Sequence, residues 1–249
     1  MAVNYQNKIV TNGLVLCLDA ADKKSYPGSG TVWADRSGRG NNGTLTNGPT
    51  FSSANGGSIV FDGTNDYINC GTTLGNFGTS NFTINFFFKT STSLFPRTFI
   101  SKSIGDSPTI DYGWLIDNGS NSSNLGFAIA TANGSWGISG SYSTQTLGAT
   151  INNGIWQMAT LVADRSQANV NIYLNSTNQS LQSYAGGSSF STVGNVNNDK
   201  ILSIGSESDI AVSPFHISSN ISQVQIYNRA LTPQEITQNF NATRGRFAI

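Results

Sequence analysis

The sequence predicts an all-β fold, an antiparallel sandwich of two sheets, and three observations lead to this prediction. First, the 249 residues include 27 Gly and 29 Asn, whereas only 10% are charged and only two are Glu. Helices usually carry far more Glu, Lys and Ala on their outer faces. Second, short apolar runs recur between Gly, Asn and Asp turns, as in sandwiches and barrels. Third, strands do not alternate with helical patterns, which argues against a parallel sheet.

The expected strands are short runs that alternate in polarity or are rich in β-branched and aromatic residues. In the run NVNIYLN, for example, Val170, Ile172 and Leu174 fall on one face of a strand. In chain order the expected strands are LVLCLDA, SIVFDG, DYINC, FTINFFFKT, TFISKS, YGWLID, LGFAIAT, IWQMATLVAD, ANVNIYLN, KILSIG and ISQVQIYN.

One short helix is expected near the C-terminus, from residue 233 to about 241. Thr232 is a good N-cap, and Pro233 occupies the first helical position, where its missing N–H costs nothing. Glu235 stands at the third helical position and can complete a capping box with Thr232. Leu231 and Ile236 have the spacing of a hydrophobic staple.

The chain is expected to form an N-terminal arm over residues 1–11 and a single domain over residues 12–249. Basic and acidic residues balance at 13 each without a basic stripe, so no nucleic-acid partner is expected. We also expect no membrane partner, because the sequence has no polybasic or amphipathic anchor and no apolar stretch of bilayer length. The first residues lack the pattern of a secretory signal. Cys17 and Cys70 are expected to be buried free thiols.

The glycine-rich stretch DRSGRGNNG, which begins at Asp35, has the composition of a phosphate or metal loop. A phosphate loop is not expected, because no Gly-Lys-Ser/Thr follows and no helix begins there. Asp35 and Ser37 can instead accept backbone N–H groups in a tight turn. Gly38, Gly40 and Gly43 can take a positive φ without strain. The stretch is therefore predicted to be an architectural turn, with cation binding as the alternative.

The order of several motifs resembles a known family. The motifs are GLVLCLDA, WADRSGRGNNGTLTNGP, SIVFDGTNDYINCG, FTINFFFKT, YLNS, LSIG and ISQVQIYNRALTPQEITQNFNATRGRF. Together they resemble the laminin-G-like jelly-roll domains of the concanavalin A-like lectin/glucanase superfamily, over about residues 12 to 242. The combination is similar to the version found in bacteriophage structural proteins. The resemblance implies two antiparallel sheets, one of them concave, in a lectin, a glycosidase or an adhesion module.

Hydrolysis by the family mechanism is not expected. Glycosidases of this superfamily usually carry an E-x-D-x-E motif on one strand, and this motif places two carboxyl groups close together. Here Glu207 stands in a loop, Glu235 stands on the helix, and Asp62 and Asp66 flank a GTN turn. The one histidine, His216, is not accompanied by a G-x-S-x-G motif. The sequence therefore predicts a protein that is not an enzyme, with a divergent polysaccharide hydrolase as the less favoured alternative.

Laminin-G-like domains commonly bind one Ca²⁺, and the resemblance implies where oxygen donors for that ion would lie. The donors in matching loops are Asp35, Asn41, Asp62 and Asp66, which offer the carboxylate and amide oxygens that Ca²⁺ prefers. Many relatives carry an acid in the closing strand where this chain has ISQ. We therefore expect no required cofactor and keep Ca²⁺ as an open alternative.

Carbohydrate sites combine a flat aromatic face with amides and carboxylates. Trp136 lies in the glycine-rich turn NGSWG, and Tyr112 and Trp114 lie on the expected strand YGWLID. Tyr142 is expected to lie in a polar loop. These four residues are the candidate glycan-binding residues, although a structural role is favoured over ligand contact for Trp136 and Tyr142. Trp156, by contrast, is expected in the core.

The sequence thus predicts a non-enzymatic surface protein of a bacteriophage virion, either a capsid decoration or a fibre component. Its expected partners are other virion proteins and host cell-surface glycans, and a homo-oligomer is compatible with that role. The alternative is a carbohydrate-binding lectin or receptor-binding module.

Overall fold

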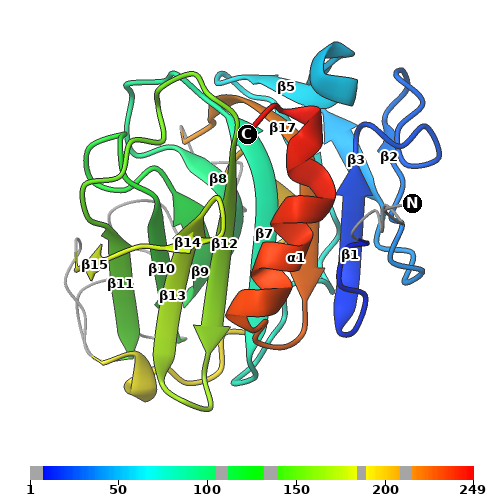
Figure 1. Cartoon of the computed structure of the whole chain (residues 1–249). Helices are drawn as coiled ribbons and strands as arrows, with labels where there is room; N and C mark the ends of the chain where they lie inside the picture. The colour runs from blue at the N-terminus through cyan, green and yellow to red at the C-terminus, as the bar shows by residue number, and fades with distance from the viewer. Residues whose placement is uncertain (1–7, 105–111, 132–139, 184–188, 208–214) are drawn as a thin grey trace, which may run out of the picture.

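The computed structural model describes residues 8–104, 112–131, 140–183, 189–207 and 215–249. These residues form two antiparallel sheets that enclose an apolar core, with one helix laid on the outside of the first sheet (Figure 1). The predicted two-sheet β-sandwich with a single short C-terminal helix is therefore confirmed.

In the described residues, the first sheet has eight strands. They are β1 (Leu14–Asp19), β4 (Thr50–Ser52), β5 (Ser58–Asp62), β7 (Phe82–Lys89), β12 (Gln157–Asp164), β13 (Asn169–Leu174), β14 (Thr177–Asn178) and β17 (Ser218–Tyr227). Their order is β14-β13-β12-β7-β17-β5-β4, and β1 also pairs with β17. The long strand β17 pairs with β5 along its first half and with β1 along its second half.

The second sheet has nine strands in the order β15-β11-β10-β9-β8-β16-β6-β3-β2. They are β2 (Val32–Trp33), β3 (Gly43–Thr46), β6 (Tyr67–Asn69), β8 (Thr98–Ile104), β9 (Tyr112–Asp117), β10 (Gly126–Ala130), β11 (Ser141–Thr146), β15 (Leu181–Gln182) and β16 (Ser203–Ile204). The described part of the chain also contains three short 3₁₀ helices, η1 (Ala54–Gly56), η2 (Phe190–Thr192) and η3 (Arg244–Arg246).

Strand β7 shows why some runs are apolar without alternation. Its Phe86 and Phe88 face the core and contact Phe99 of β8, with ring centroids 5.4 and 4.8 Å apart. Phe87 points to the other side of the sheet, where its ring stacks on that of Phe247 at 4.9 Å. Residues 86–88 are therefore buried on both faces and read as a continuous apolar run. Thr83 and Asn85 share the outer face with Phe87, and they are buried with hydrogen bonds to Arg229 and Gln225. Trp156 lies in the same outer cluster and is buried, as predicted.

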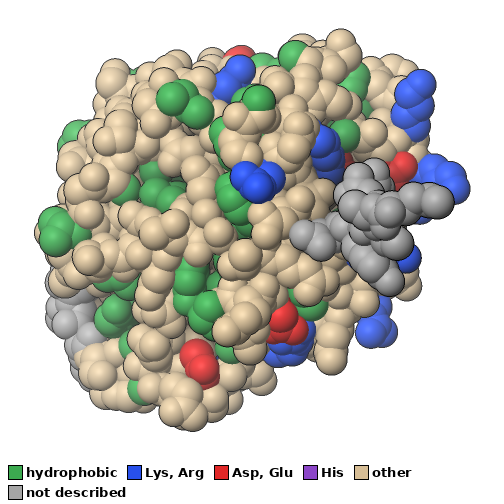
Figure 2. Space-filling model, viewed as in Figure 1, with side chains coloured by type: hydrophobic (Ala, Val, Ile, Leu, Met, Phe, Trp, Pro, Cys, Tyr) green, Lys and Arg blue, Asp and Glu red, His purple; other side chains and the backbone are tan. Residues whose placement is uncertain are grey.

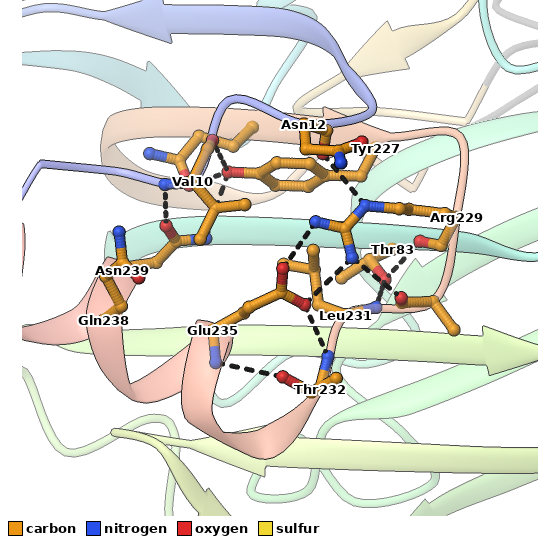
Figure 3. Close-up of polar contacts among 12 residues, drawn as sticks. Val10, Asn12, Thr83, Tyr227, Arg229, Leu231, Thr232, Glu235, Gln238 and Asn239 are labelled. Carbon is orange, nitrogen blue, oxygen red and sulfur yellow. Dashed lines mark hydrogen bonds and ion pairs between the residues drawn. The ribbon is translucent and has the colours of Figure 1, made fainter.

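Helix α1 (Pro233–Thr243) covers the outside of the first sheet and begins as the sequence predicts. The Thr232 hydroxyl accepts the Glu235 backbone N–H at 3.3 Å, and the Glu235 carboxylate accepts the Thr232 N–H at 2.9 Å. The guanidinium of Arg229 donates to both oxygens of that carboxylate, at 2.9 and 2.6 Å (Figure 3). Leu231 and Ile236 are both buried in the cluster beneath the helix, in keeping with the expected staple.

The end of the expected N-terminal arm is tied to this helix. The backbone N–H of Val10 donates to the Asn239 side chain at 2.8 Å, and the Tyr227 hydroxyl donates to the Val10 carbonyl at 2.9 Å (Figure 3). Residues 1–7 of the arm lie outside the described residues.

Cys17 and Cys70 are buried and not joined in a disulfide, which confirms the predicted free thiols. Burial raises the pKa of each thiol to about 12. Within the described part of the chain, no helix is long and apolar enough to cross a membrane.

Candidate functional site

The glycine-rich loop is organised around the carboxylate of Asp35. One carboxylate oxygen accepts the backbone N–H groups of Cys17 and Ser37, at 2.9 and 2.8 Å. The other accepts the Ser37 hydroxyl at 2.7 Å and the Asn41 N–H at 3.0 Å. Burial acts to raise the pKa of Asp35, but these hydrogen bonds outweigh it and lower that pKa below its usual range. Four protein donors thus occupy the carboxylate, which is the geometry of an architectural turn.

The glycines of the loop play two different roles. Gly38 and Gly40 adopt φ values of 82° and 78°, as expected. The same expectation for Gly43 was wrong, because Gly43 is the first residue of β3 and has no positive φ. Glycine is required there for space, since a Cβ atom would lie 2.5 Å from Cγ2 of Ile68.

The four oxygen donors expected for Ca²⁺ separate into two pairs. Asp66 accepts the Asp62 backbone N–H at 3.0 Å, and Asp62 pairs with Ser218 at the start of β17. Asp35 and Asn41 belong to the glycine-rich loop, and Asp35 accepts the backbone N–H of Cys17 in β1. Cys17 pairs with Gln225, which lies near the end of β17.

Ser218 and Gln225 are separated by roughly 20 Å of strand. The four residues therefore do not fit one Ca²⁺ site. The described part of the chain also contains no group of three His, Cys, Asp or Glu residues that could hold a metal ion.

The aromatic residues expected to bind glycans differ in how far their side chains are exposed to solvent. Trp114 is 0% exposed, so its ring has no face to offer a sugar, which corrects the expectation for this residue. Tyr142 lies on β11 and not in a loop as expected; it is half-buried and packs against Phe190, with ring centroids 5.3 Å apart. Tyr112 is half-buried at the start of β9, and Trp136 lies outside the described residues.

A cleft that sequence reasoning missed lies beside the glycine-rich loop, where β6 ends and β3 begins. It has a volume of about 390 Å³ and is lined by Gly40, Asn41, Asn42, Thr44, Asn69, Cys70, Gly71, Thr72, Thr73 and Leu74. A second hollow of about 360 Å³ is lined by Val15, Arg39, Asn41, Thr73, Leu74, Gly75, Asn76, Phe77 and Asn228. The two hollows share Asn41, Thr73 and Leu74, and we refer to them together as the amide cleft.

The side-chain amides of this cleft are each anchored at one end. The Asn41 amide donates to the Val15 carbonyl at 2.8 Å, and the Asn42 amide oxygen accepts the Asp35 N–H at 2.9 Å. The Asn69 amide oxygen accepts the N–H of Gly71 at 2.8 Å. The opposite ends, which are Oδ1 of Asn41 and Nδ2 of Asn42 and Asn69, have no hydrogen-bond partner within the described chain. The cleft thus presents both acceptors and donors in fixed positions.

The wall formed by residues 71–77 is held from beneath by two buried side chains. The Trp114 indole N–H donates to the Gly75 carbonyl at 2.9 Å. The Lys102 ammonium donates to the Thr72 carbonyl at 2.7 Å and also to the Lys200 carbonyl. Burial lowers the pKa of Lys102 to about 8. Trp114 therefore supports the cleft instead of contacting a ligand.

Two signals in the sequence could have pointed to this cleft. The dipeptides Asn41–Asn42 and Thr72–Thr73 both stand beside glycines, in NNGT and CGTT. They are 31 positions apart along the chain. Only the pairing of β3 with β6 brings them to the same end of the sheet.

Comparison with known proteins agrees with the fold. Residues 62–237 match the family model described as the concanavalin A-like lectin/glucanases superfamily, of the Laminin_G_3 type. No curated protein matches the chain significantly.

Solved structures with the same fold include the binding domain of Paraclostridial Mosquitocidal Protein 1, with a TM-score of 0.66 and 18% identity. That match covers 93% of this chain and 52% of the other. The receptor-binding domain of botulinum neurotoxin C/D mosaic serotype also has a TM-score of 0.66, at 14% identity, over 93% of this chain and 51% of the other.

A structure of botulinum neurotoxin type C, which is described as depending on interaction with two ganglioside molecules to enter cells, matches with a TM-score of 0.62 and 15% identity. That match covers 94% of this chain and 52% of the neurotoxin chain. The chain therefore spans about half the length of these structures and shares their jelly-roll fold. Because the family model covers most of its length, the chain belongs to the concanavalin A-like lectin/glucanase superfamily.

Proposed function

We propose that this chain is a non-catalytic carbohydrate-binding module that holds an acidic oligosaccharide in the amide cleft. The observation that carries the proposal is the set of half-anchored amides, from Asn41, Asn42 and Asn69. A sugar hydroxyl both donates and accepts hydrogen bonds, so it matches a wall that fixes both kinds of group. Because one end of each amide is already bonded, little side-chain entropy is lost when the other end binds.

The charge of the cleft favours an acidic sugar. Arg39 is exposed and lines the second hollow, and neither hollow is lined by Asp or Glu. A guanidinium forms strong, often bidentate hydrogen bonds with a carboxylate. Asp35 does not oppose such a ligand directly, because its carboxylate is occupied by the loop's own donors.

Similarity to the neurotoxin domains supports this proposal through the fold alone. Gangliosides are glycolipids whose sugars carry a carboxylate, and the type C neurotoxin interacts with two of them. The identity of 15% and the coverage of half that chain transfer the jelly-roll architecture only.

The arrangement of carboxylates supports a binding role without turnover. Glycoside hydrolysis requires two carboxyl groups facing one bond. Glu235 is paired with Arg229 at the start of α1. Asp62 ends β5, and Asp66 lies just after the turn that follows it. None of these carboxylates lines the amide cleft.

Titration calorimetry with a sialylated oligosaccharide and its neutral, desialylated counterpart tests the proposal. Loss of a hydrogen bond to a charged group weakens binding by about tenfold or more. We expect the sialylated sugar to bind, Arg39→Gln to remove the preference for it, and Asn69→Leu to weaken both sugars. Asn178→Ala, an exposed amide on the edge strand β14, serves as the matched control. Equal binding by Asn69→Leu and the unmodified protein, or release of reducing ends, would overturn the proposal.

We further propose that the module is displayed on the surface of a bacteriophage particle. Support comes from the motif order that resembles phage structural proteins and from an exterior rich in amides and hydroxyls. Immunogold labelling of purified particles with an antibody to this chain is expected to decorate them. Particles that lack the chain by mass spectrometry would refute this placement.

A further inference from the structure

Exposed apolar side chains gather at one end of the sandwich. Five large hydrophobic residues in the described chain are more than half exposed: Val32 (52%), Leu94 (59%), Phe95 (54%), Leu147 (55%) and Ile155 (55%). Four of them stand on the loops at the end where β7 finishes and β12 begins, which is uppermost in Figure 1. The loops are residues 90–97, 118–125 and 147–156, and we call them the upper loops. Val32 alone lies elsewhere, on the edge strand β2.

The upper loops are joined to one another by hydrogen bonds. The Asn118 side chain donates to the Leu94 carbonyl at 2.6 Å and accepts the Arg97 backbone N–H at 2.7 Å. Asn118 is itself 0% exposed, so the side chain that bridges the loops lies inside the folded protein. It fixes the backbone on both sides of Phe95.

The third loop is held to the other two in the same way. The Gly154 N–H donates to the Thr90 carbonyl at 2.9 Å, and the Ile151 N–H donates to the Ser123 carbonyl at 2.9 Å. Ile151 is fully buried and anchors its loop in the core. The neighbouring apolar residue Ile155 nevertheless points into solvent. These loops therefore expose apolar side chains on an ordered support.

The apolar side chains of this surface are separated by polar atoms. Figure 2 shows separate hydrophobic side chains among polar atoms at the upper end of the face in view. Leu94 and Phe95 are adjacent and precede Pro96, whereas Leu147 and Ile155 stand at the two ends of their loop. Exposed apolar side chains that alternate with polar atoms match the mixed polar and apolar boundary of a bilayer.

The charge of the upper loops points to the kind of surface that they contact. The three loops contain Arg97 and no Asp or Glu. Lys89, at the end of β7, adds a second cation and lies 5.6 Å from the ring centroid of Trp156. An exposed carboxylate at the same end, Asp62, stands two strands away from β7, at the end of β5. Cations beside apolar tips complement anionic lipid head groups.

We propose that the upper loops bind the surface of a lipid bilayer that carries anionic head groups. Leu94, Phe95, Leu147 and Ile155 insert at the boundary between head groups and acyl chains, and Arg97 and Lys89 contact the phosphates. The sequence predicted no membrane partner because these residues are scattered over some sixty positions and form no amphipathic or polybasic segment. Only the fold brings them to one end. The amide cleft is lined by other residues, so this inference is independent of the proposed function.

Co-sedimentation with vesicles tests the proposal without any glycolipid. We expect the protein to bind vesicles of phosphatidylcholine and phosphatidylserine, and to bind pure phosphatidylcholine less. Replacing Leu94 and Phe95 together by Ser removes two inserted side chains and should lower the vesicle partition constant by about tenfold or more. Arg97→Gln should reduce the preference for phosphatidylserine. Val32→Ser, an equally exposed apolar residue away from the loops, should leave binding unchanged.

The outcomes separate lipid binding from other uses of the surface. All the replaced side chains are exposed or half-buried, so melting curves should show that the variants remain folded. Unchanged binding in the Leu94→Ser/Phe95→Ser protein, or no binding by the unmodified protein, would overturn the proposal. A dimer that the same double substitution dissociates, without vesicle binding, would assign the surface to a second copy instead.

Discussion

The carboxylate of Asp35 accepts the backbone N–H of Cys17 at 2.9 Å, and this bond joins the glycine-rich loop to β1. An Asp35→Ala variant would leave the Cys17 N–H without its hydrogen-bond partner. It would also remove the carboxylate around which the loop is organised. An unsatisfied buried donor costs about 1–3 kcal/mol, and three further bonds end on the same carboxylate. We expect Asp35→Ala to lower the free energy of unfolding in urea by about 2 kcal/mol or more.

A suitable control is Arg36→Ala in the same loop, which breaks the ion pair between Arg36 and Asp22. Both side chains of that pair are about 40% exposed, at 42% and 39%. Exposed ion pairs contribute about 0–1 kcal/mol. If the two variants were equally stable, Asp35 would not organise the loop.

A methyl group at Gly43 should destabilise the sandwich because it would meet Ile68. The added Cβ would lie 2.5 Å from the Ile68 Cγ2 atom and 3.4 Å from the Leu18 Cδ1 atom. Overpacking of this kind typically costs about 1–3 kcal/mol. We therefore expect Gly43→Ala to lower the melting temperature. Gly245→Ala is the matched control, because its Cβ would meet no atom within 4 Å, and it should have little effect.

Local patterns were sufficient for the parts of the fold that depend on neighbours in sequence. Strand alternation predicted the inward face of β13, and the spacing of Thr232, Pro233 and Glu235 predicted the start of α1. Each of these depends on residues a few positions apart, so a linear pattern records it.

The candidate site depends on contacts between distant segments, and the sequence could not supply them. Trp114 stands on a predicted strand, but the strand pattern does not show whether its face is core or solvent. Tyr142 was predicted to lie in a loop, and its place on β11 depends on the pairing of β11 with β10. The amide cleft needs Asn41 and Thr73 to meet across the end of a sheet. Gly43 lies in a glycine-rich stretch that is typical of a turn. Glycine is needed there because a Cβ atom would collide with Ile68.

The two thiols should be unreactive in the folded protein. Cys17 and Cys70 are each 5% exposed, and burial raises their pKa from 9.0 to about 12. The reactive species is the thiolate. An Ellman's reagent assay at pH 8 is expected to detect no thiol in the native protein and both after unfolding in guanidinium. Rapid reaction of either thiol without denaturant would contradict the burial.

The same burial makes stability depend on alkaline pH. Between pH 9 and 12 the unfolded chain releases thiol protons that the folded protein keeps, so the folded state binds more protons. Stability must therefore fall as pH rises through this range. A Cys17→Ala/Cys70→Ala protein should show a shallower fall when urea unfolding is followed from pH 8 to 11. An identical slope in both proteins would show that the thiols do not contribute.

Loss of the N-cap should weaken the attachment of α1. The Thr232 hydroxyl satisfies the Glu235 N–H, which Ala cannot do. Such replacements cost about 1 kcal/mol. We expect Thr232→Ala to lower the free energy of unfolding by about that amount, measured by urea denaturation. Thr232→Ser keeps the hydroxyl and should retain most of the stability, so equal losses in both variants would rule out the cap as the cause.

The ion pair at the same helix end should appear as a stability change in acid. The hydrogen bond from Arg229 is the largest cause that lowers the pKa of Glu235, from 4.5 to about 2. Above pH 4.5 the carboxylate is ionised in both states, and its interaction with Arg229 contributes fully to stability. As pH falls from 4.5 to 2, the unfolded chain takes up a proton before the folded protein does, so this contribution is lost.

Glu235→Gln separates the charge from the cap. Glutamine can still accept the Thr232 N–H and complete a capping box, but it cannot be ionised. We expect this variant to be less stable than the unmodified protein at pH 6, with the difference shrinking toward pH 2 in urea denaturation. A difference that stays constant across this range would mean that the charge of Glu235 does not account for the change in stability.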